Sequence, residues 1–255
     1  MHEIYSPIEG DLLRVREGMN RYYNIKAGKL DGFAYLDKHT EELCPALVLY
    51  TARLYGETTD RVISLAQVFQ FIQLASRVHY NINEDWQINE NNCSDPRDGC
   101  QYPVLVGDYL YGRFFTTLCE AEIVEYLGPL AEIICLINEG GIVRLKNQSG
   151  GMVRTGARRE IIRLEIAELM AGCCKIGGQV AGADQDSQQR LYKFGFSLGM
   201  AVGMLSSKMH NQAGSYFKEA LSFLETLGSG KKRDDLKSLV LYLKNADTDI
   251  RKMVC

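Results

Sequence analysis

Residues 60–85 read DRVISLAQVFQFIQLASRVHYNINED, and this stretch decides the fold. Apolar side chains recur in it every three to four residues, which is the spacing of an α-helix. They cover the helix nearly all round, at Val62, Ile63, Leu65, Val68, Phe69, Phe71, Ile72, Leu74 and Val78. A helix that is apolar on every side belongs inside a bundle of other helices. The stretch therefore predicts a central helix that begins after Asp60 as its N-cap.

Helical patterns continue on both sides of this central segment. They cover residues 42–55, about 103–139, 158–183 and 187–210, followed by two shorter helices in the tail. Polar or glycine-rich segments at 86–101 and 140–157 are expected to be loops. No alternating pattern of convincing strand length occurs. We expect an all-α fold, with residues 1–255 forming a single domain of long antiparallel helices.

Three glycines form a seam in the predicted helix 187–210. Gly195, Gly199 and Gly203 recur every four residues and so share one face. Each glycine costs a helix about 1 kcal/mol relative to alanine. Their spacing predicts that the backbone of another helix approaches closely along this face.

The composition excludes several classes of protein. The chain has 255 residues, 46% hydrophobic residues and a formal charge of −3. This balance is unlike that of a disordered chain, and it argues against a nucleic-acid partner, which favours a basic face. No apolar run is long enough to predict a transmembrane segment, and the first twenty residues resemble no secretory signal. The eight cysteines are therefore expected to be reduced thiols in a cytoplasmic protein.

Several motifs occur in the order and spacing of a known family. The chain carries PALVL at 45–49, VLVGDYL at 104–110, Glu139-Gly140, and Phe194-Gly195 followed by Leu198-Gly199. In these motifs the sequence resembles the trans-type polyprenyl (isoprenyl) diphosphate synthases, over about residues 40–210 and again in the tail. The resemblance implies a bundle of long helices around a deep central cavity, commonly paired as a dimer.

The resemblance also implies a reaction that this chain lacks the groups to perform. In the family, two aspartate-rich motifs hold magnesium ions, which bind the substrate diphosphate. Here one motif acid, Glu84, remains where six are expected, with Asp85 beside it, and we expect no magnesium site and no cofactor. The residues at these vestigial positions are Tyr80, Asn81, Glu84 and Asp85 in the first motif, and Ser206, Ser207 and His210 in the second.

The basic residues that bind diphosphate in the family are replaced as well. Glu41, Cys44 and Glu165 stand where the resemblance places basic side chains. A segment after the second motif is also missing, so the domain is expected to be shortened there. The small residues Ala75 and Ser76 precede the first motif, at positions that in the family leave a pocket for the growing chain. They serve equally well for close helix packing.

Apolar and glycine positions that build the scaffold are thus retained, whereas charged positions that perform the chemistry are lost. The leading hypothesis is a non-catalytic or regulatory subunit of a heteromeric polyprenyl diphosphate synthase. In this role it pairs with an active subunit, although a homodimer is also open. Two alternatives remain. One is an isoprenoid- or lipid-binding protein that uses the vestigial cavity, and the other is a prenyltransferase with residual or altered activity.

Overall fold

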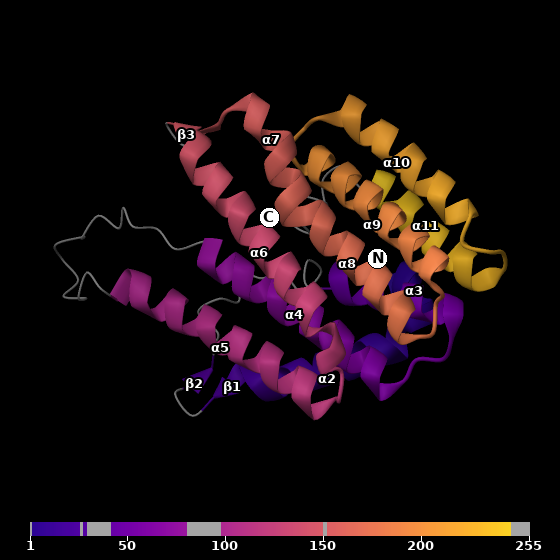
Figure 1. Cartoon of the computed structure of the whole chain (residues 1–255), viewed down its shortest axis with the longest axis horizontal. Coiled ribbons are helices and arrows are strands. Elements are labelled where there is room, and N and C mark those ends of the chain that lie inside the picture. Colours follow the sequence, from indigo (N-terminus) through magenta and orange to yellow (C-terminus); the bar gives the residue numbers. More distant parts are fainter. Residues whose placement is uncertain (1, 26–27, 30–41, 81–97, 150–151, 246–255) are drawn as a thin grey trace.

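The computed structural model describes residues 2–25, 28–29, 42–80, 98–149 and 152–245, and Figure 1 shows them as a bundle of helices. The elements, in chain order, are α1 (His2–Tyr5), η1 (Ser6–Ile8), α2 (Glu9–Tyr23), β1 (Asn24–Ile25), β2 (Gly28–Lys29), α3 (Leu43–Tyr55), α4 (Asp60–Tyr80), α5 (Asp98–Glu120), η3 (Val124–Tyr126), α6 (Leu127–Asn147), β3 (Gln148–Ser149), β4 (Met152–Val153), α7 (Thr155–Ile162), η4 (Arg163–Ala167), α8 (Glu168–Val180), α9 (Gln185–Ser206), α10 (His210–Glu225) and α11 (Lys231–Asn245). The strands form two antiparallel pairs of two residues each, so the all-α expectation is confirmed.

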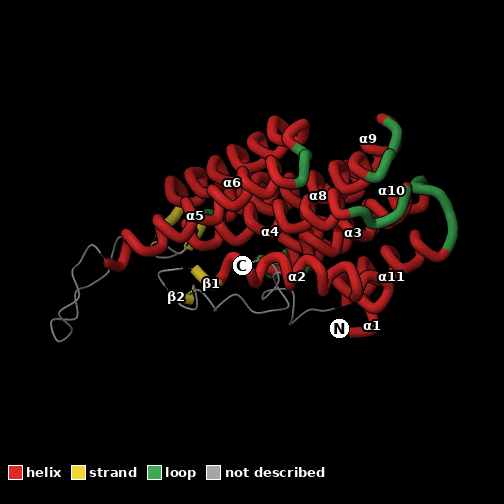
Figure 2. Tube along the Cα trace, turned by 90° about the horizontal axis from the view of Figure 1, so that it is seen from below, coloured by secondary structure: helices red, strands yellow, loops and turns green. Residues whose placement is uncertain are grey.

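Helix α4 is the central helix that its sequence predicts. Val62, Phe69 and Phe71 are completely buried, although they point in different directions around the helix. It packs against α5, α3, α2, α8 and α6, so each of its faces has a neighbour. In Figure 2, α2 lies on one side of α4 and α6 lies on the other. Helices α5 and α6 follow each other through η3, and both lie at the outside of the bundle in Figure 1.

The glycine seam of α9 lies directly against the backbone of α8 and η4. A Cβ atom added at Gly195 would lie 2.6 Å from the carbonyl oxygen of Met170, and one at Gly199 would lie 2.6 Å from the Cα of Ala167. One at Gly203 would lie 2.4 Å from a methyl group of Ile162. The close helix approach that the spacing predicts is therefore confirmed, and it fixes how α9 crosses the bundle.

The predicted helix at 158–183 is a continuous helical rod with one irregular turn. It consists of α7, η4 and α8, and η4 is π-helical. A π-helical turn inserts one extra residue and rotates the following side chains, and such turns occur often at functional sites. In this chain the turn contains Glu165 and faces α6.

Several predicted boundaries are wrong. The helical pattern at 103–139 is two helices, because α5 ends at Glu120 and α6 begins at Leu127, and α7 begins at Thr155 within the predicted loop. Residues 140–147, predicted as a loop, belong to α6, and Gly140 within this helix makes room for the side chain of Glu165. Residues 98–101, also predicted as a loop, already belong to α5. Helix α9 ends at Ser206 rather than at residue 210, because Lys208 adopts a left-handed conformation with φ of 62°.

Helix α2 forms before residue 42, where no element was expected. Its buried side chains, with Ile8 just before it, follow helical spacing at Ile8, Leu12, Val15 and Met19. The side-chain amide of Gln67 on α4 packs against Gly18 of α2. A Cβ atom at position 18 would overlap this amide. This helix covers the side of α4 that faces away from α6.

Candidate functional site

Two of the predicted positions, Tyr80 and Glu165, meet at the C-terminal end of α4 through Arg144, a residue that the sequence did not single out. The Arg144 guanidinium on α6 forms a two-pronged ion pair with the Glu165 carboxylate on η4, with Nε 3.1 Å from Oε1. The same guanidinium lies over the ring of Tyr80, 4.7 Å from its centroid, and its Nη1 lies 3.4 Å from the Tyr80 hydroxyl. The site therefore joins α4, α6 and η4 through one cation.

The two charged side chains of this site are largely enclosed. The side chain of Arg144 is 24% exposed and that of Glu165 is 15% exposed. Glu165 fits because it lies over Gly140, where a Cβ atom would be 2.5 Å from its Cγ. Charges that lose water need a partner, and a two-pronged arginine–carboxylate pair is the strongest one available. The site is thus neutralised from within the chain.

The second-motif positions lie in the tight turn between α9 and α10. Ser206 ends α9, Ser207 follows as its cap, and His210 begins α10. The amide N–H of Met209 donates to the carbonyl of Met204 at 2.8 Å, which closes the turn. The hydroxyl of Ser206 donates to the Gly203 carbonyl at 2.8 Å, so it is engaged within its own helix.

The described donors at these positions do not fit magnesium. Magnesium prefers carboxylate and phosphate oxygens in octahedral geometry. The described residues offer hydroxyls at Tyr80, Ser206 and Ser207 and an imidazole at His210. No group of three or more His, Cys, Asp or Glu side chains that could hold a metal ion occurs in the described part of the chain. Asn81, Glu84 and Asp85 lie outside the described residues, as does Glu41.

Cys44 lies in the core rather than beside Glu165. It is the second residue of α3, 3% exposed, and its thiol lies against that of Cys173 on α8. Cys174 is also completely buried, and burial raises the pKa of both the Cys173 and Cys174 thiols. Thiols held in the neutral form by burial are poor nucleophiles, so this cluster serves packing.

The small residues before the first motif lie against α5. Ala75 is completely buried, and the hydroxyl of Ser76 lies 3.4 Å from that of Tyr111. The Tyr111 ring also contacts the His79 ring, with centroids 5.7 Å apart. Burial raises the pKa of the Tyr111 hydroxyl, which therefore stays neutral. A large aromatic side chain thus stands beside the position where the resemblance implies a chain pocket.

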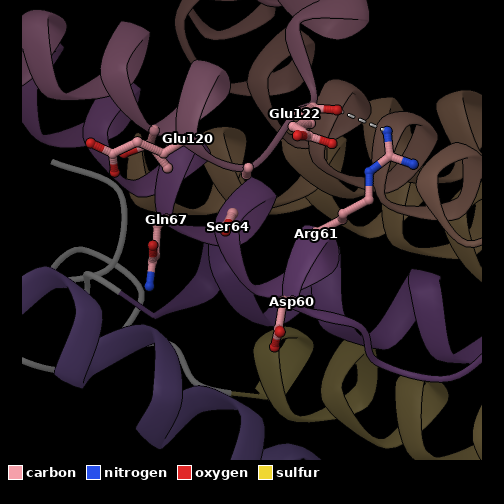
Figure 3. Close-up of a pocket in the computed structure, with 8 residues that line it drawn as sticks. Asp60, Arg61, Ser64, Gln67, Glu120 and Glu122 are labelled. Carbon is pink, nitrogen blue, oxygen red and sulfur yellow. Dashed lines mark hydrogen bonds between the residues drawn. The ribbon is translucent and has the colours of Figure 1, made fainter.

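One hollow of about 410 Å³ lies at the opposite end of α4, and Figure 3 shows the polar side chains that line it. A helix of 21 residues is roughly 30 Å long, so this hollow is remote from Tyr80. Arg61 donates to the Glu122 carbonyl and pairs with Glu125, whereas Asp60 pairs with Arg14. Its lining residues are Asp60, Arg61, Ser64, Gln67, Thr117, Glu120, Ala121 and Glu122.

A second hollow, of about 260 Å³, lies beside α7 and is lined by arginines that the chain already uses. Arg163 binds the Glu160 carboxylate at 2.7 and 3.0 Å and the Glu168 carboxylate at 3.1 Å. This pairing lowers the pKa of Glu160. Arg159 donates to the Tyr216 hydroxyl at 2.8 Å. Neither of these two hollows is lined by Ala75 or Ser76.

Helices α5 and α6 present apolar side chains to the outside. Of the nine large apolar side chains that are exposed in the described part of the chain, six lie between residues 104 and 145. Contrary to the expectation from the sequence, the stretch Val124–Asn147 is long and apolar enough to cross a membrane by length and composition alone, and 28% of its 18-residue apolar window is buried. The six side chains are Val104, Leu105, Phe115, Val124, Ile142 and Leu145.

The outward residues of both helices recur at alternating steps of three and four, and we call these two rows the outer seams. This is the repeat by which one helix packs against another. Gly112 and Gly128 lie in the seams, and among the described residues no atom lies within 4 Å of a Cβ added at either. The seams consist of Leu105, Asp108, Gly112, Phe115 and Cys119 on α5, and Gly128, Ala131, Cys135, Asn138, Ile142 and Leu145 on α6.

Comparison with known proteins agrees with this fold. The chain is 28% identical over 203 residues to heptaprenyl diphosphate synthase component 2 of Geobacillus stearothermophilus, which covers 78% of this chain and 63% of that protein. The chain therefore spans less than two thirds of that relative's length. Octaprenyl diphosphate synthase of Escherichia coli is 21% identical over 183 residues, covering 71% of this chain and 57% of that protein.

Solved structures and a family model point the same way. A decaprenyl diphosphate synthase from Rhodobacter capsulatus superposes with a TM-score of 0.81 at 18% identity, covering 95% of this chain and 98% of the other. The geranyl diphosphate synthase small subunit from Antirrhinum majus superposes with a TM-score of 0.72 at 17% identity, covering 94% and 98%. The family model described as polyprenyl synthetase matches residues 33–202. The chain therefore belongs to the polyprenyl synthetase family.

Proposed function

We propose that the chain is a non-catalytic or regulatory subunit of a heteromeric polyprenyl diphosphate synthase. The observation that carries the proposal is the ion pair between Arg144 and Glu165. Glu165 stands where the resemblance implies a lysine that binds diphosphate. The Glu165 carboxylate repels a diphosphate. It also binds Arg144, the nearby cation that could otherwise have replaced the lost lysine in binding a diphosphate.

The positions of the metal motifs support the same proposal. Ionisation of an allylic diphosphate needs the leaving group to be neutralised, and in this family carboxylate-bound magnesium supplies that charge. Here the second-motif positions hold Ser206, Ser207 and His210, and Ser206 already donates to its own helix. Among the described residues, the second-motif positions hold no carboxylate that could bind a metal ion.

The names of two similar proteins support a role within a larger assembly. One relative is named component 2 of a heptaprenyl diphosphate synthase, and one similar structure is named a small subunit. The outer seams of α5 and α6 give such a role a physical basis, because they expose apolar side chains at helix-packing spacing. We propose that this face holds the catalytic partner.

Two assays test the proposed function. The pure chain, given allylic and isopentenyl diphosphates with magnesium, is expected to show no turnover. A related synthase that carries both aspartate motifs is expected to co-purify with the chain and to change its rate or product length. If that synthase reaches the same rate and product length without the chain, the subunit role is wrong. If the pure chain turns over substrate, it is an enzyme instead.

The ion pair at the site also leads to a prediction of stability. Replacing Glu165 with glutamine is expected to lower the free energy of unfolding by about 1–2 kcal/mol, because the largely enclosed Arg144 guanidinium loses its charged partner. Urea unfolding followed by circular dichroism measures this loss. The matched control is Glu160→Gln, which breaks an exposed pair with Arg163 and is expected to cost about 0.5 kcal/mol. Equal losses in the two variants would show that Glu165 has no special structural role.

A further inference from the structure

The outer seams are bordered by acidic side chains. Glu132 and Glu139 lie on α6, each one residue past a seam position, and both are exposed. Asp108 lies within the α5 seam, with its side chain 64% exposed and its Oδ1 3.7 Å from Nε2 of His79. In a pair of packed helices, charges beside the seam meet charges of the partner and decide which partner is accepted. We call these three carboxylates the acidic rim.

Few cations offset this rim in the described part of α5 and α6. Arg144 is held by Glu165, and Arg113 is half-buried on the flank of α5. Lys146 is the one exposed cation of the two described helices. Glu125, at the turn between them, is paired with Arg61. The outward face of each copy therefore carries net negative charge around an apolar centre.

From this charge pattern we propose that the α5–α6 face selects a helical partner with a basic rim and disfavours a second copy of this chain. The inference rests on the proposed function, which it deepens by stating the chemistry of the partner surface. Two copies related by a two-fold axis bring the same surface against itself, so the acidic rims of both meet in one interface. Like charges brought together at an interface suppress pairing, whereas opposite charges accelerate and strengthen it.

The apolar seams and the acidic rim thus have separate roles. Leu105, Phe115, Ile142 and Leu145 supply the contact area that any pairing needs. These side chains do not distinguish one apolar partner from another, because hydrophobic attraction is non-directional and does not depend on charge. The rim adds that discrimination, as charges beside the seam do in coiled coils. The acidic rim of the α5–α6 face thereby favours pairing with a different, basic subunit over pairing with a second copy.

The test uses the full-length chain and a charge-reversed copy as the basic partner. The variant Glu132→Lys/Glu139→Lys changes exposed side chains and is expected to fold normally. Analytical ultracentrifugation compares the natural chain, the variant and their equimolar mixture. The mixture is expected to dimerise at least about tenfold more tightly than either protein alone. At about 1 M salt, where exposed charges are screened, this difference is expected to disappear.

Two further variants make the result specific to the face. Glu57→Lys/Glu219→Lys reverses two exposed acids elsewhere, on the α3–α4 connection and on α10, and is expected to give no mixed dimer. The neutral variant Glu132→Gln/Glu139→Gln is expected to self-associate more tightly than the natural chain. The proposal is overturned if the natural chain dimerises with itself as tightly as the mixture does, or if the mixture does not associate.

This test can fail independently of the proposed function, because it needs only this chain and its variants. If the mixture does not pair but a catalytic synthase still co-purifies and changes its product, the subunit role stands and the partner binds another face. If the mixture pairs but no synthase responds to the chain, the charge selection stands and the subunit role is wrong.

Discussion

Replacing Gly199 with valine is expected to lower the free energy of unfolding by about 3 kcal/mol or more. The Cβ atom of any side chain at this position would lie 2.6 Å from the Cα of Ala167 and 3.1 Å from the carbonyl oxygen of Ile166. These are backbone atoms of a helical rod, which cannot move aside as a flexible side chain can. Helix α9 would have to separate from η4, and overpacking of this kind is strongly destabilising.

Urea unfolding followed by circular dichroism measures this effect. The matched control is Gly214→Ala on α10, where an added Cβ atom meets nothing within 4 Å. That control is expected to stabilise the chain by up to about 1 kcal/mol, because alanine favours the helix more than glycine does. A Gly199→Val variant as stable as the natural protein would contradict the close approach of α9 and η4.

The double variant Ile142→Ala/Leu145→Ala is expected to weaken binding of the catalytic partner by about 100-fold or more. These side chains are 51% and 73% exposed, so their removal costs the isolated chain little. In the proposed complex they become buried, and burying a large aliphatic side chain contributes about 1.5–3 kcal/mol. Losing two such contacts near the centre of an interface exceeds the 2.7 kcal/mol of a 100-fold change.

Two exposed thiols report on the same pairing. Cys119 and Cys135 lie in the outer seams, and both are exposed. The partner is expected to protect them from alkylation in the natural chain and to leave them reactive in the double variant, as peptide mass spectrometry of each site can measure. The control Leu13→Ala/Leu241→Ala removes exposed leucines from α2 and α11 and should retain full protection. If all three proteins bind equally, the partner does not use this face.

The sequence predicts the inner part of the fold well, because that part is encoded by local patterns. The apolar circumference of α4 requires neighbours on all sides, and the glycine spacing of α9 requires a close helix. Each of these features can be seen within the sequence of one helix, so it can be predicted without knowing how the helices pack. Helix α2 is also encoded locally, because its buried residues Ile8, Leu12, Val15 and Met19 recur at helical spacing.

The candidate site is less predictable, because it depends on contacts between distant segments. Arg144 lies in a stretch whose glycines predict a loop, and its role becomes apparent only when α6 places it beside Glu165 and Tyr80. The end of α9 depends on one left-handed residue, Lys208, of a type that rarely adopts this conformation. The positions of Glu41, Asn81, Glu84 and Asp85 stay outside the described residues, so the expectations about them remain predictions.

The apolar outer seam of α6 has a consequence for the amount of this protein in a cell. A copy without its partner presents Ile142 and Leu145 to water, and quality-control proteases and chaperones act on exposed apolar surface of this kind. In the proposed complex the partner covers the same side chains and protects the chain from degradation. Under the proposed function, unassembled copies are therefore expected to be removed faster than assembled ones, so that the supply of the partner sets the lifetime of this chain.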